Sequence, residues 1–261
     1  MQKSILKLGL LLVASLLACN KNEITKPATT ANQKTNALKM TANDSLKVGL
    51  IAYYPFTNNA TDSSGRHHNG TVVNALLTSD RFGMANSAYA FNGKSSYISV
   101  KDSSDLRLNN TDFTLNMWVN MDAYKWVNLP AYGNALLIKR QHTGNLTGWG
   151  ASIQNGAPFF NVAGPQITKS VSKSKITSAM WHMVTITYSL KQQQVSFYID
   201  GILKSAGTGI ITPDALNNSQ LYIGHNDQST SDYFKGSIDD IRVYNRKLST
   251  NEMLSLFGKI N

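Results

Sequence analysis

Glutamate and cysteine are the residue types that this sequence has least of. It contains two glutamates, Glu23 and Glu252, and one cysteine, Cys19. The glutamates lie near opposite ends of the chain, so none is left for the segments between them, and most of the aspartates lie at predicted turns. Glycoside hydrolysis needs a pair of suitably spaced carboxylates, and the chain also lacks a Gly-x-Ser-x-Gly motif and a phosphate-binding loop. These absences argue against an enzyme.

The single cysteine follows the longest apolar run near the N-terminus. The run Leu8–Ala18 is too short to span a bilayer, which takes about 20 residues, and Lys3 and Lys7 precede it as in a secretory signal peptide. The sequence LLAC at its end resembles a bacterial lipobox. We predict that residues 1–18 are a lipoprotein signal peptide and that Cys19 is acylated, which implies a lipid-anchored protein of the bacterial cell envelope, expected in the outer membrane. A cysteine within an ordinary cleaved signal is the alternative.

The formal net charge is +10. Two parts of the chain after the predicted signal peptide, residues 19–47 and 48–261, differ in composition. Residues 19–47 are rich in Asn, Thr, Lys and Ala without apolar periodicity, which is typical of a flexible tether. In residues 48–261 the Lys and Arg are scattered, and the densest group is Lys169, Lys173 and Lys175 in KSVSKSK. We interpret this group as a solvated hairpin loop. The clustering that tracks nucleic-acid phosphates is missing, so a nucleic-acid partner is not expected.

From residue 48 onward, short segments of alternating polarity are separated by turn residues, which predicts one all-β domain over 48–261. The segments are 49–56, 87–93, 97–100, 112–121, 134–141, 150–154, 180–189, 194–204, 221–225 and 238–244. Asp200-Gly201 between two apolar runs predicts a β-hairpin. A helical pattern begins only at Ser249, with Glu252 at capping-box spacing and Gly258 as a stop. The pattern predicts two antiparallel sheets and one short C-terminal helix.

Several motifs in these segments occur in a distinctive order. They are YYPFTNNATDSSGRHHNGT (53–71), AYAFNG (88–93), DFTLNMWV (112–119), MWHMVTITY (180–188), FYIDG (197–201), LYIGH (221–225) and GSIDDIRVYNRKLSTNEM (236–253). The ordered set resembles the laminin-G-like jelly roll of the concanavalin A-like lectin/glucanase superfamily, in its pentraxin-related branch, from Tyr53 to Leu256. The resemblance implies a two-sheet antiparallel jelly-roll sandwich, often with one calcium ion, in secreted bacterial proteins that handle or bind glycans.

Two adjacent carboxylates, Asp239 and Asp240, lie within the last strand-like segment. Side chains alternate along a strand, so we expect Asp239 to share the apolar face of Ile241 and Val243, where an unpaired carboxylate is costly. The resemblance implies that its partner is the early loop DSSGRHHNG (62–70) and that the two are joined by calcium, which prefers six to eight hard oxygen ligands.

The resemblance also supplies the ligands of this site. It implies the carboxylates of Asp62 and Asp239 and, with less support, the carbonyls of Gly65 and His68. In the alternative without a metal ion, Asp62 only caps its turn, and Asp239 accepts hydrogen bonds from backbone N–H groups. A zinc site at the adjacent His67 and His68 is not expected, because the sequence offers no further nitrogen or sulfur ligands beside them.

Aromatic residues in two predicted loops are candidates for carbohydrate binding. Tyr124, Trp126 and Tyr132 lie in one loop and Trp149 lies in another, TGWG. Aromatic rings can stack on the apolar face of a sugar. The alternative is that these rings close the ends of the sandwich core.

The leading functional hypothesis is a membrane-anchored, calcium-stabilised, lectin-like module that binds carbohydrate or a glycan-bearing partner at the bacterial envelope. One alternative is a structural or adhesive surface protein that binds protein partners. Another is a glycoside hydrolase with an atypical catalytic pair.

Overall fold

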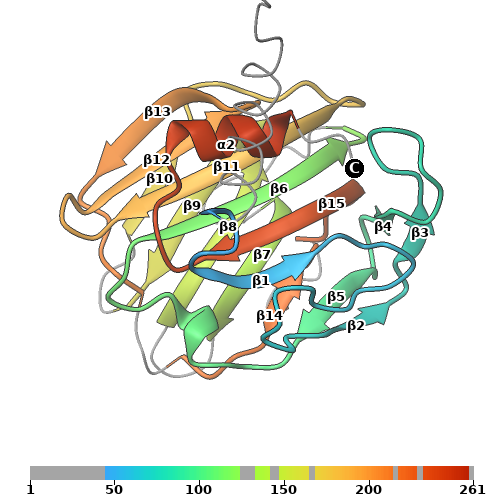
Figure 1. Cartoon of the computed structure of the whole chain (residues 1–261), viewed down its shortest axis with the longest axis horizontal. Coiled ribbons are helices and arrows are strands. Elements are labelled where there is room, and N and C mark those ends of the chain that lie inside the picture. The colour runs from blue at the N-terminus through green and yellow to red at the C-terminus, as the bar shows by residue number, and fades with distance from the viewer. Residues whose placement is uncertain are drawn as a thin grey trace, which may run out of the picture. The chain divides into compact units, whose positions relative to one another are not determined.

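The described residues form two antiparallel β-sheets that pack face to face, with an α-helix near the C-terminus on the outer side of one sheet (Figure 1). The structure is a computed structural model that describes residues 45–123, 133–141, 147–164, 168–213, 217–227 and 232–258. These residues all belong to one compact unit of the chain, Met40–Asn261. The architecture confirms the predicted all-β, two-sheet jelly-roll sandwich with a short C-terminal helix.

The first sheet, called sheet A, has eight strands. Its strands are β1 (Leu50–Tyr54), β3 (Leu76–Thr78), β4 (Ala88–Asn92), β6 (Phe113–Met121), β11 (Trp181–Ser189), β12 (Gln194–Ile199), β13 (Ile202–Thr208) and β15 (Lys235–Tyr244). They are ordered β13-β12-β11-β6-β15-β4-β3, and β1 also pairs with β15. The hairpin predicted at Asp200-Gly201 joins β12 to β13 and is confirmed.

The second sheet, called sheet B, has seven strands in the order β10-β9-β8-β7-β14-β5-β2. Its strands are β2 (Gly70–Val73), β5 (Tyr97–Val100), β7 (Asn134–Gln141), β8 (Thr147–Gln154), β9 (Ala157–Ala163), β10 (Thr168–Val171) and β14 (Leu221–Ile223). A short 3-10 helix, η1 (Asp105–Arg107), follows β5, and the α-helix α2 (Thr250–Phe257) follows β15.

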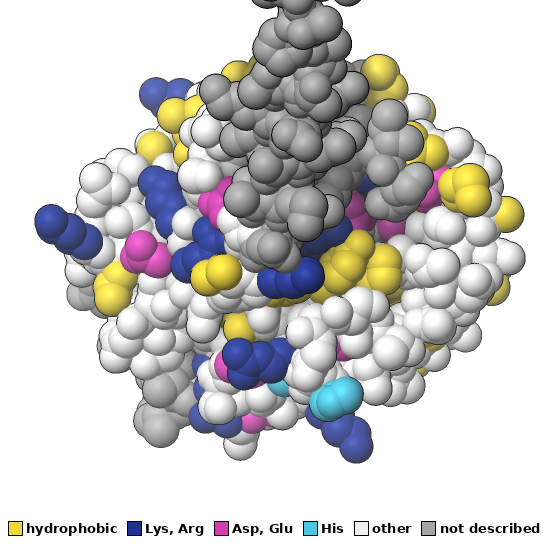
Figure 2. All heavy atoms as spheres, in the orientation of Figure 1, with side chains coloured by type: hydrophobic (Ala, Val, Ile, Leu, Met, Phe, Trp, Pro, Cys, Tyr) yellow, Lys and Arg dark blue, Asp and Glu magenta, His cyan; other side chains and the backbone are white. Residues whose placement is uncertain are grey.

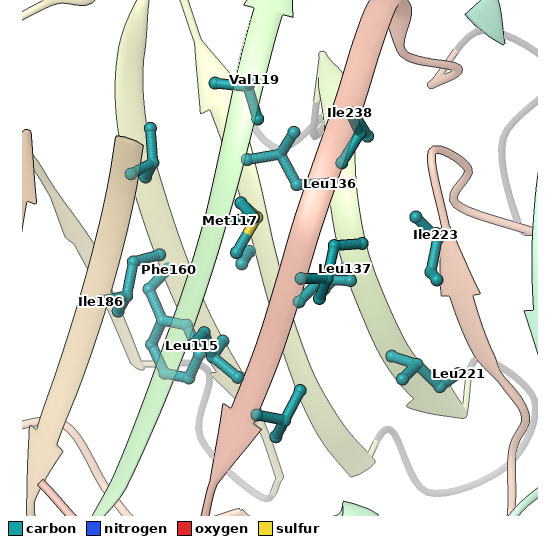
Figure 3. Packing of buried hydrophobic residues seen from close by; sticks show 14 of the residues in the cluster. Leu115, Met117, Val119, Leu136, Leu137, Phe160, Ile186, Leu221, Ile223 and Ile238 are labelled. Atoms are coloured by element: carbon teal, nitrogen blue, oxygen red, sulfur yellow. The ribbon is translucent and has the colours of Figure 1, made fainter. Parts of the chain in front are cut away.

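The core lies between the two sheets and is built from the inward-facing residues of their strands (Figure 3). Leu115, Met117 and Val119 of β6 point inward because side chains alternate with period two. They lie in the same buried cluster as Leu136 and Leu137 of β7. Burial of these apolar side chains is the main favourable contribution to packing the two sheets together.

The alternation of side chains breaks in β15. The predicted orientation of Asp239 is therefore wrong. The register of β15 against β6 shifts between Asp239 and Arg242, and Asp240 has a φ of 54°. This β-bulge adds a residue, so Ile238 and Ile241 both reach the core. Asp239 therefore faces outward, opposite Trp118, and does not share the face of Ile241.

Two predicted loops are wholly or partly strands of sheet B, although Lys173 and Lys175 lie beyond the end of β10. Lys169, expected in a hairpin loop, lies in β10, which pairs with β9. The segment TGWG begins β8, which pairs with β7. Gly148 explains why this strand fits: it has a φ of 104°, and a Cβ there would come within 2.1 Å of the carbonyl oxygen of Lys139. Glycine thus permits a close approach of β8 to β7 that the loop interpretation did not anticipate.

Charged side chains are spread over the face shown in Figure 2. Lys and Arg side chains lie there in several separate groups, with Asp and Glu side chains among them.

Helix α2 begins with the predicted capping box. Ser249 Oγ accepts a hydrogen bond from the Glu252 backbone N–H, and Glu252 Oε2 accepts one from the Ser249 N–H at 2.8 Å. Arg246 Nη2 lies 2.7 Å from Glu252 Oε1. Although partial burial opposes the shift, these charged and hydrogen-bonding partners lower the pKa of Glu252 to about 2.

We predict that Glu252→Gln lowers the free energy of unfolding by roughly 1 kcal/mol at pH 7, the usual contribution of such a cap. The folded pKa lies below the ordinary value of 4.5, so the stabilisation is present above about pH 4.5 and is lost as the pH falls towards 2. Urea unfolding at a series of pH values measures both effects. Equal losses for the variant at pH 7 and pH 2.5 would contradict the assignment.

Candidate functional site

The loop predicted to hold calcium uses its own carboxylate for hydrogen bonds. Asp62 Oδ1 accepts from the backbone N–H groups of Tyr53 and Ser64, both at 2.9 Å. Asp62 Oδ2 accepts from Ser64 Oγ at 2.8 Å and from the His68 N–H at 2.9 Å. Both oxygens therefore accept two hydrogen bonds each, as in the alternative in which Asp62 caps its turn.

The carbonyl of His68 is also engaged. It accepts a hydrogen bond of 2.7 Å from the hydroxyl of Tyr54, while His68 Nε2 lies 3.1 Å from Asp105 Oδ2. Gly65 lies at the exposed tip of the loop with a φ of 85°. These contacts tie the loop to β1 and to η1.

The partner of Asp239 is an arginine. Arg81 Nη1 donates to Asp239 Oδ2 at 2.9 Å, and Arg81 Nη2 lies 3.5 Å from Asp240 Oδ2. A second arginine, Arg242, places Nη1 2.7 Å from Asp240 Oδ1. Burial and the adjacent Asp240 carboxylate raise the pKa of Asp239 above its ordinary value, whereas Arg81 favours the ionised carboxylate.

Asp62 and Asp239 lie on different sides of β1. The Tyr53 N–H donates to Asp62, and the Tyr53 carbonyl accepts from the Ser63 N–H. The N–H and C=O of one strand residue point to the same edge, so the loop lies along the edge of β1 that faces away from β15 (Figure 1).

The residues present do not fit a calcium ion shared by the loop and the last strand. Each carboxylate is satisfied within its own neighbourhood, and one of the two predicted carbonyl ligands is hydrogen-bonded to a tyrosine. Across the ranges that the structure describes, no group of three His, Cys, Asp or Glu side chains could hold a metal ion. Calcium binding stays a prediction, and this set of donors does not support it.

The predicted aromatic residues and the lipid anchor lie mostly outside the described residues. This applies to Tyr124, Trp126, Tyr132 and Cys19. No helix within the described ranges is long and apolar enough to cross a membrane.

For Trp149 the prediction of a loop that is open to sugar is wrong. The side chain lies in β8 and is fully buried, and its Nε1 donates to the Leu106 carbonyl at 3.1 Å. Trp149 belongs to the core, in agreement with the alternative interpretation. Its hydrogen bond to the Leu106 carbonyl connects β8 to η1.

A cavity of about 320 Å³ lies beside η1. It is lined by Ser104, Asp105, Arg107, Leu108, Asn109, Thr111 and Asn245. Its charged groups have partners, because Arg107 Nη2 lies 2.6 Å from Asp102 Oδ2 and Asp105 lies against His68. The cavity is large enough for a small ligand, but its charged side chains already form ion pairs.

Four aromatic side chains gather on the outer face of sheet B, and sequence reasoning missed them. This aromatic group consists of Tyr97, Tyr222, His225 and Tyr233. The His225 ring stacks on Tyr233 with centroids 4.0 Å apart and planes at 11°. Its centroid lies 5.2 Å from that of Tyr97 and 5.8 Å from that of Tyr222. The three tyrosines are partly exposed, whereas His225 is buried.

Strand alternation explains why these rings share the outer face. Ile98 of β5 and Ile223 of β14 lie in the core, so Tyr97 and Tyr222 point the other way. The strands pair with Ile223 opposite Ile98, which places the two tyrosines near each other. The signal was therefore present in YISV and LYIGH, as a large ring on the polar side of each strand.

Polar atoms beside the aromatic group have no hydrogen-bond partner among the residues that the structure describes. They include His225 Nδ1 and Asn226 Oδ1, both on buried side chains. Asn226 Nδ2 donates to Asp232 Oδ2 at 3.1 Å, which orients its amide. Ring faces with nearby donors and acceptors are what a sugar requires, since its ring has apolar faces and hydroxyl edges.

Comparison with known proteins agrees with this fold. Residues 92–253 match the family model described as "Concanavalin A-like lectin/glucanases superfamily", which is more than half of the chain. The chain belongs to this superfamily. No curated protein sequence matches it significantly. The expected pentraxin-related branch stays a prediction.

Solved structures of the superfamily fold resemble the chain at low identity. Domain 4 of AbnA, a GH43 extracellular arabinanase from Geobacillus stearothermophilus in complex with arabinotriose, has a TM-score of 0.65 and 20% identity, covering 79% of this chain and 97% of that domain. The binding domain of Paraclostridial Mosquitocidal Protein 1 has a TM-score of 0.62 and 20% identity over 81% of this chain. A botulinum neurotoxin type C structure has a TM-score of 0.60 and 16% identity over 82% of it. The alignments cover 52% of each toxin chain.

We predict that the aromatic group makes stability pH-dependent through His225. Burial lowers the pKa of His225 from 6.5 to about 4, with Asp232 opposing the shift. The unfolded chain takes up a proton near pH 6.5 while the folded chain does not, so stability falls as the pH drops from 6.5 to 4, by about 3 kcal/mol at most. Chemical denaturation across this range measures the loss.

The variant His225→Phe keeps a flat ring and is expected to remove this component of the pH dependence. His67→Asn is the matched control, because His67 is exposed and asparagine tolerates its φ of 62°. A His225→Phe variant with the same pH profile as the parent would refute the prediction.

Proposed function

We propose that the chain is a carbohydrate-binding module that binds a glycan, or a glycan-bearing partner, through the aromatic group on the outer face of sheet B. The observation that carries the proposal is the cluster of three partly exposed tyrosine rings around His225. Rings of this kind can stack on the apolar face of a sugar, and the phenol hydroxyls of the tyrosines can donate and accept hydrogen bonds.

The relatives support this choice of ligand. The arabinanase domain that covers most of this chain is in complex with arabinotriose. Botulinum neurotoxin type C is described as dependent on interaction with two ganglioside molecules for cell entry. Identities of 16–20% mean that these proteins share the fold with this chain, so the ligand itself is a matter for experiment.

Several carboxylates have structural roles that make them poor candidates for glycosidase chemistry. Glu252 caps α2 and pairs with Arg246. Asp239 contacts Arg81, and Asp240 lies against Arg242. We therefore favour binding over hydrolysis. The adhesive alternative, with a protein partner, is an outcome of the same binding test.

We predict that the purified domain binds a subset of a glycan array and that Tyr222→Ala weakens binding about tenfold, the loss expected when one stacking ring of about 1.4 kcal/mol is removed. Tyr222→Phe keeps the ring and is expected to bind within a few-fold of the parent. Titration calorimetry with the best array ligand measures both variants.

Two further variants place the binding surface. Leu76→Ala removes an exposed apolar side chain of sheet A and is expected to leave binding unchanged. Trp126→Ala tests the loop that the sequence predicts to stack on sugar. If Trp126→Ala abolishes binding and Tyr222→Ala does not, the loop is the site and the aromatic group is not. Failure to bind any glycan, together with capture of a specific envelope protein, would favour the adhesive alternative.

We also propose that the chain is held at the envelope by an acylated Cys19. Cys19→Ala is expected to move the protein from the detergent-soluble membrane fraction to the aqueous fraction, because acyl chains stabilise membrane binding by about 0.8 kcal/mol for each buried CH₂. Phase partitioning and mass spectrometry of the N-terminus report this. Ser15→Ala, four residues earlier, is the control, and an unacylated parent protein would rule the anchor out.

A further inference from the structure

The loop between β3 and β4 holds Arg81 in a fixed position. Asp80 Oδ1 accepts hydrogen bonds from the backbone N–H groups of Phe82 and Met84, both at 2.8 Å. The Gly83 N–H donates to the Asp80 carbonyl at 3.1 Å. These three bonds close a tight turn around Arg81 and fix its backbone independently of the contacts of its side chain.

The guanidinium of Arg81 is held between two aromatic rings. Its Cζ lies 4.4 Å from the ring centroid of Phe82 and 4.4 Å from that of Trp118. The Arg81 side chain is only 4% exposed. A planar cation between two ring faces is attracted by both quadrupoles and loses most of its freedom to rotate.

Arg81 lies in a group of buried charges that also includes the carboxylate of Asp80. Asp239 and Asp240 supply two carboxylates, and Arg81 and Arg242 supply two guanidiniums, all within side chains at most 5% exposed. Arg242 also lies over the Tyr53 ring at 4.0 Å. A buried carboxylate requires a neighbouring cation, and the chain provides one for Asp239 and one for Asp240 from its own side chains.

We propose that Arg81 is a fixed cation that compensates the charge of Asp239, as calcium was expected to do, and that it joins the loop between β3 and β4, not the loop 62–70, to the last strand. The two residues are 158 positions apart in the sequence, so this contact joins two segments that are distant in sequence. We therefore expect the fold of the described residues to be stable without a divalent ion at Asp239.

The first test needs no variant. The parent protein is dialysed against EDTA, and its melting temperature is compared with that of a sample in 2 mM calcium chloride, with bound metal measured by mass spectrometry. We expect the same melting temperature within about 1 °C and no calcium retained after dialysis. A lower melting temperature in EDTA that calcium restores, or one retained calcium per chain, would overturn the proposal.

The second test removes the cation. Arg81→Met keeps much of the volume and leaves Asp239 uncompensated, so we expect a fall in melting temperature of roughly 10 °C, as for breaking a buried ion pair. Arg81→Lys keeps the charge without the planar stacking. Its melting temperature is expected to lie between those of the parent and Arg81→Met. Arg66→Met is the matched control, because Arg66 is exposed, and is expected to change little.

The double variant Arg81→Met/Asp239→Asn distinguishes a fixed cation from a side chain that only fills space. It removes the carboxylate that Arg81 contacts and leaves Asp240 with Arg242, so it is expected to regain at least half of the loss seen for Arg81→Met. If Arg81→Met does not fold, the melting temperatures of the double variant and of the parent in EDTA still test the proposal. Equal melting temperatures for Arg81→Met and Arg66→Met, or a double variant less stable than the single one, would overturn the proposal.

Ligand binding provides a separate arm that rests on the proposed function. A glycan found on the array is expected to bind equally well in EDTA and in calcium. Loss of binding in EDTA at an unchanged melting temperature would mean that calcium acts at the ligand and not in the fold. If no glycan binds, the proposed function fails while the melting tests still decide the role of Arg81.

Discussion

The bulged strand β15 is the constraint on which sheet A depends. It pairs with β6 along one edge and with β1 and β4 along the other. Its inner face supplies core residues, whereas its outer face carries two carboxylates and an arginine. The bulge at Asp240 allows the strand to have an apolar inner face and a charged outer face. One extra residue turns Asp239 outward while Ile238 and Ile241 stay in the core. Only then can Arg81 reach the strand from outside, between the rings of Phe82 and Trp118.

Features that depend on neighbouring residues could be predicted from the sequence, whereas those that depend on distant residues could not. The capping box of α2 and the hairpin at Asp200-Gly201 are set by residues within a few positions of each other, and both are confirmed. The outward orientation of Asp239 is set by a bulge against β6, and a period of two cannot reveal it. Lys169 was misassigned for a similar reason, since pairing with β9 makes its segment a strand although the composition is that of a solvated loop.

The candidate site shows the same division. The acidic loop around Asp62 was recognised by its local motif, but a motif does not show whether the carboxylate is already saturated by its own backbone. The aromatic group joins β5 to residues beyond β14, more than 120 positions along the chain. Alternation alone could have placed Tyr97 and Tyr222 on a polar face, whereas their meeting with His225 depends on the pairing of β5 with β14.

The two outer faces of the sandwich use aromatic rings differently, and this bears on the ligand. On sheet A, the rings of Phe82, Trp118 and Tyr53 are occupied by the guanidiniums of the chain itself. On sheet B, the tyrosines surround His225, which is neutral at pH 7 because burial lowers its pKa to about 4. A neutral ring cluster attracts an uncharged ligand by contact area and by hydrogen bonds at its rim, without an ion pair to fix orientation. In our proposal, sheet B is therefore suited to a neutral sugar, while the charged face of sheet A stabilises the fold.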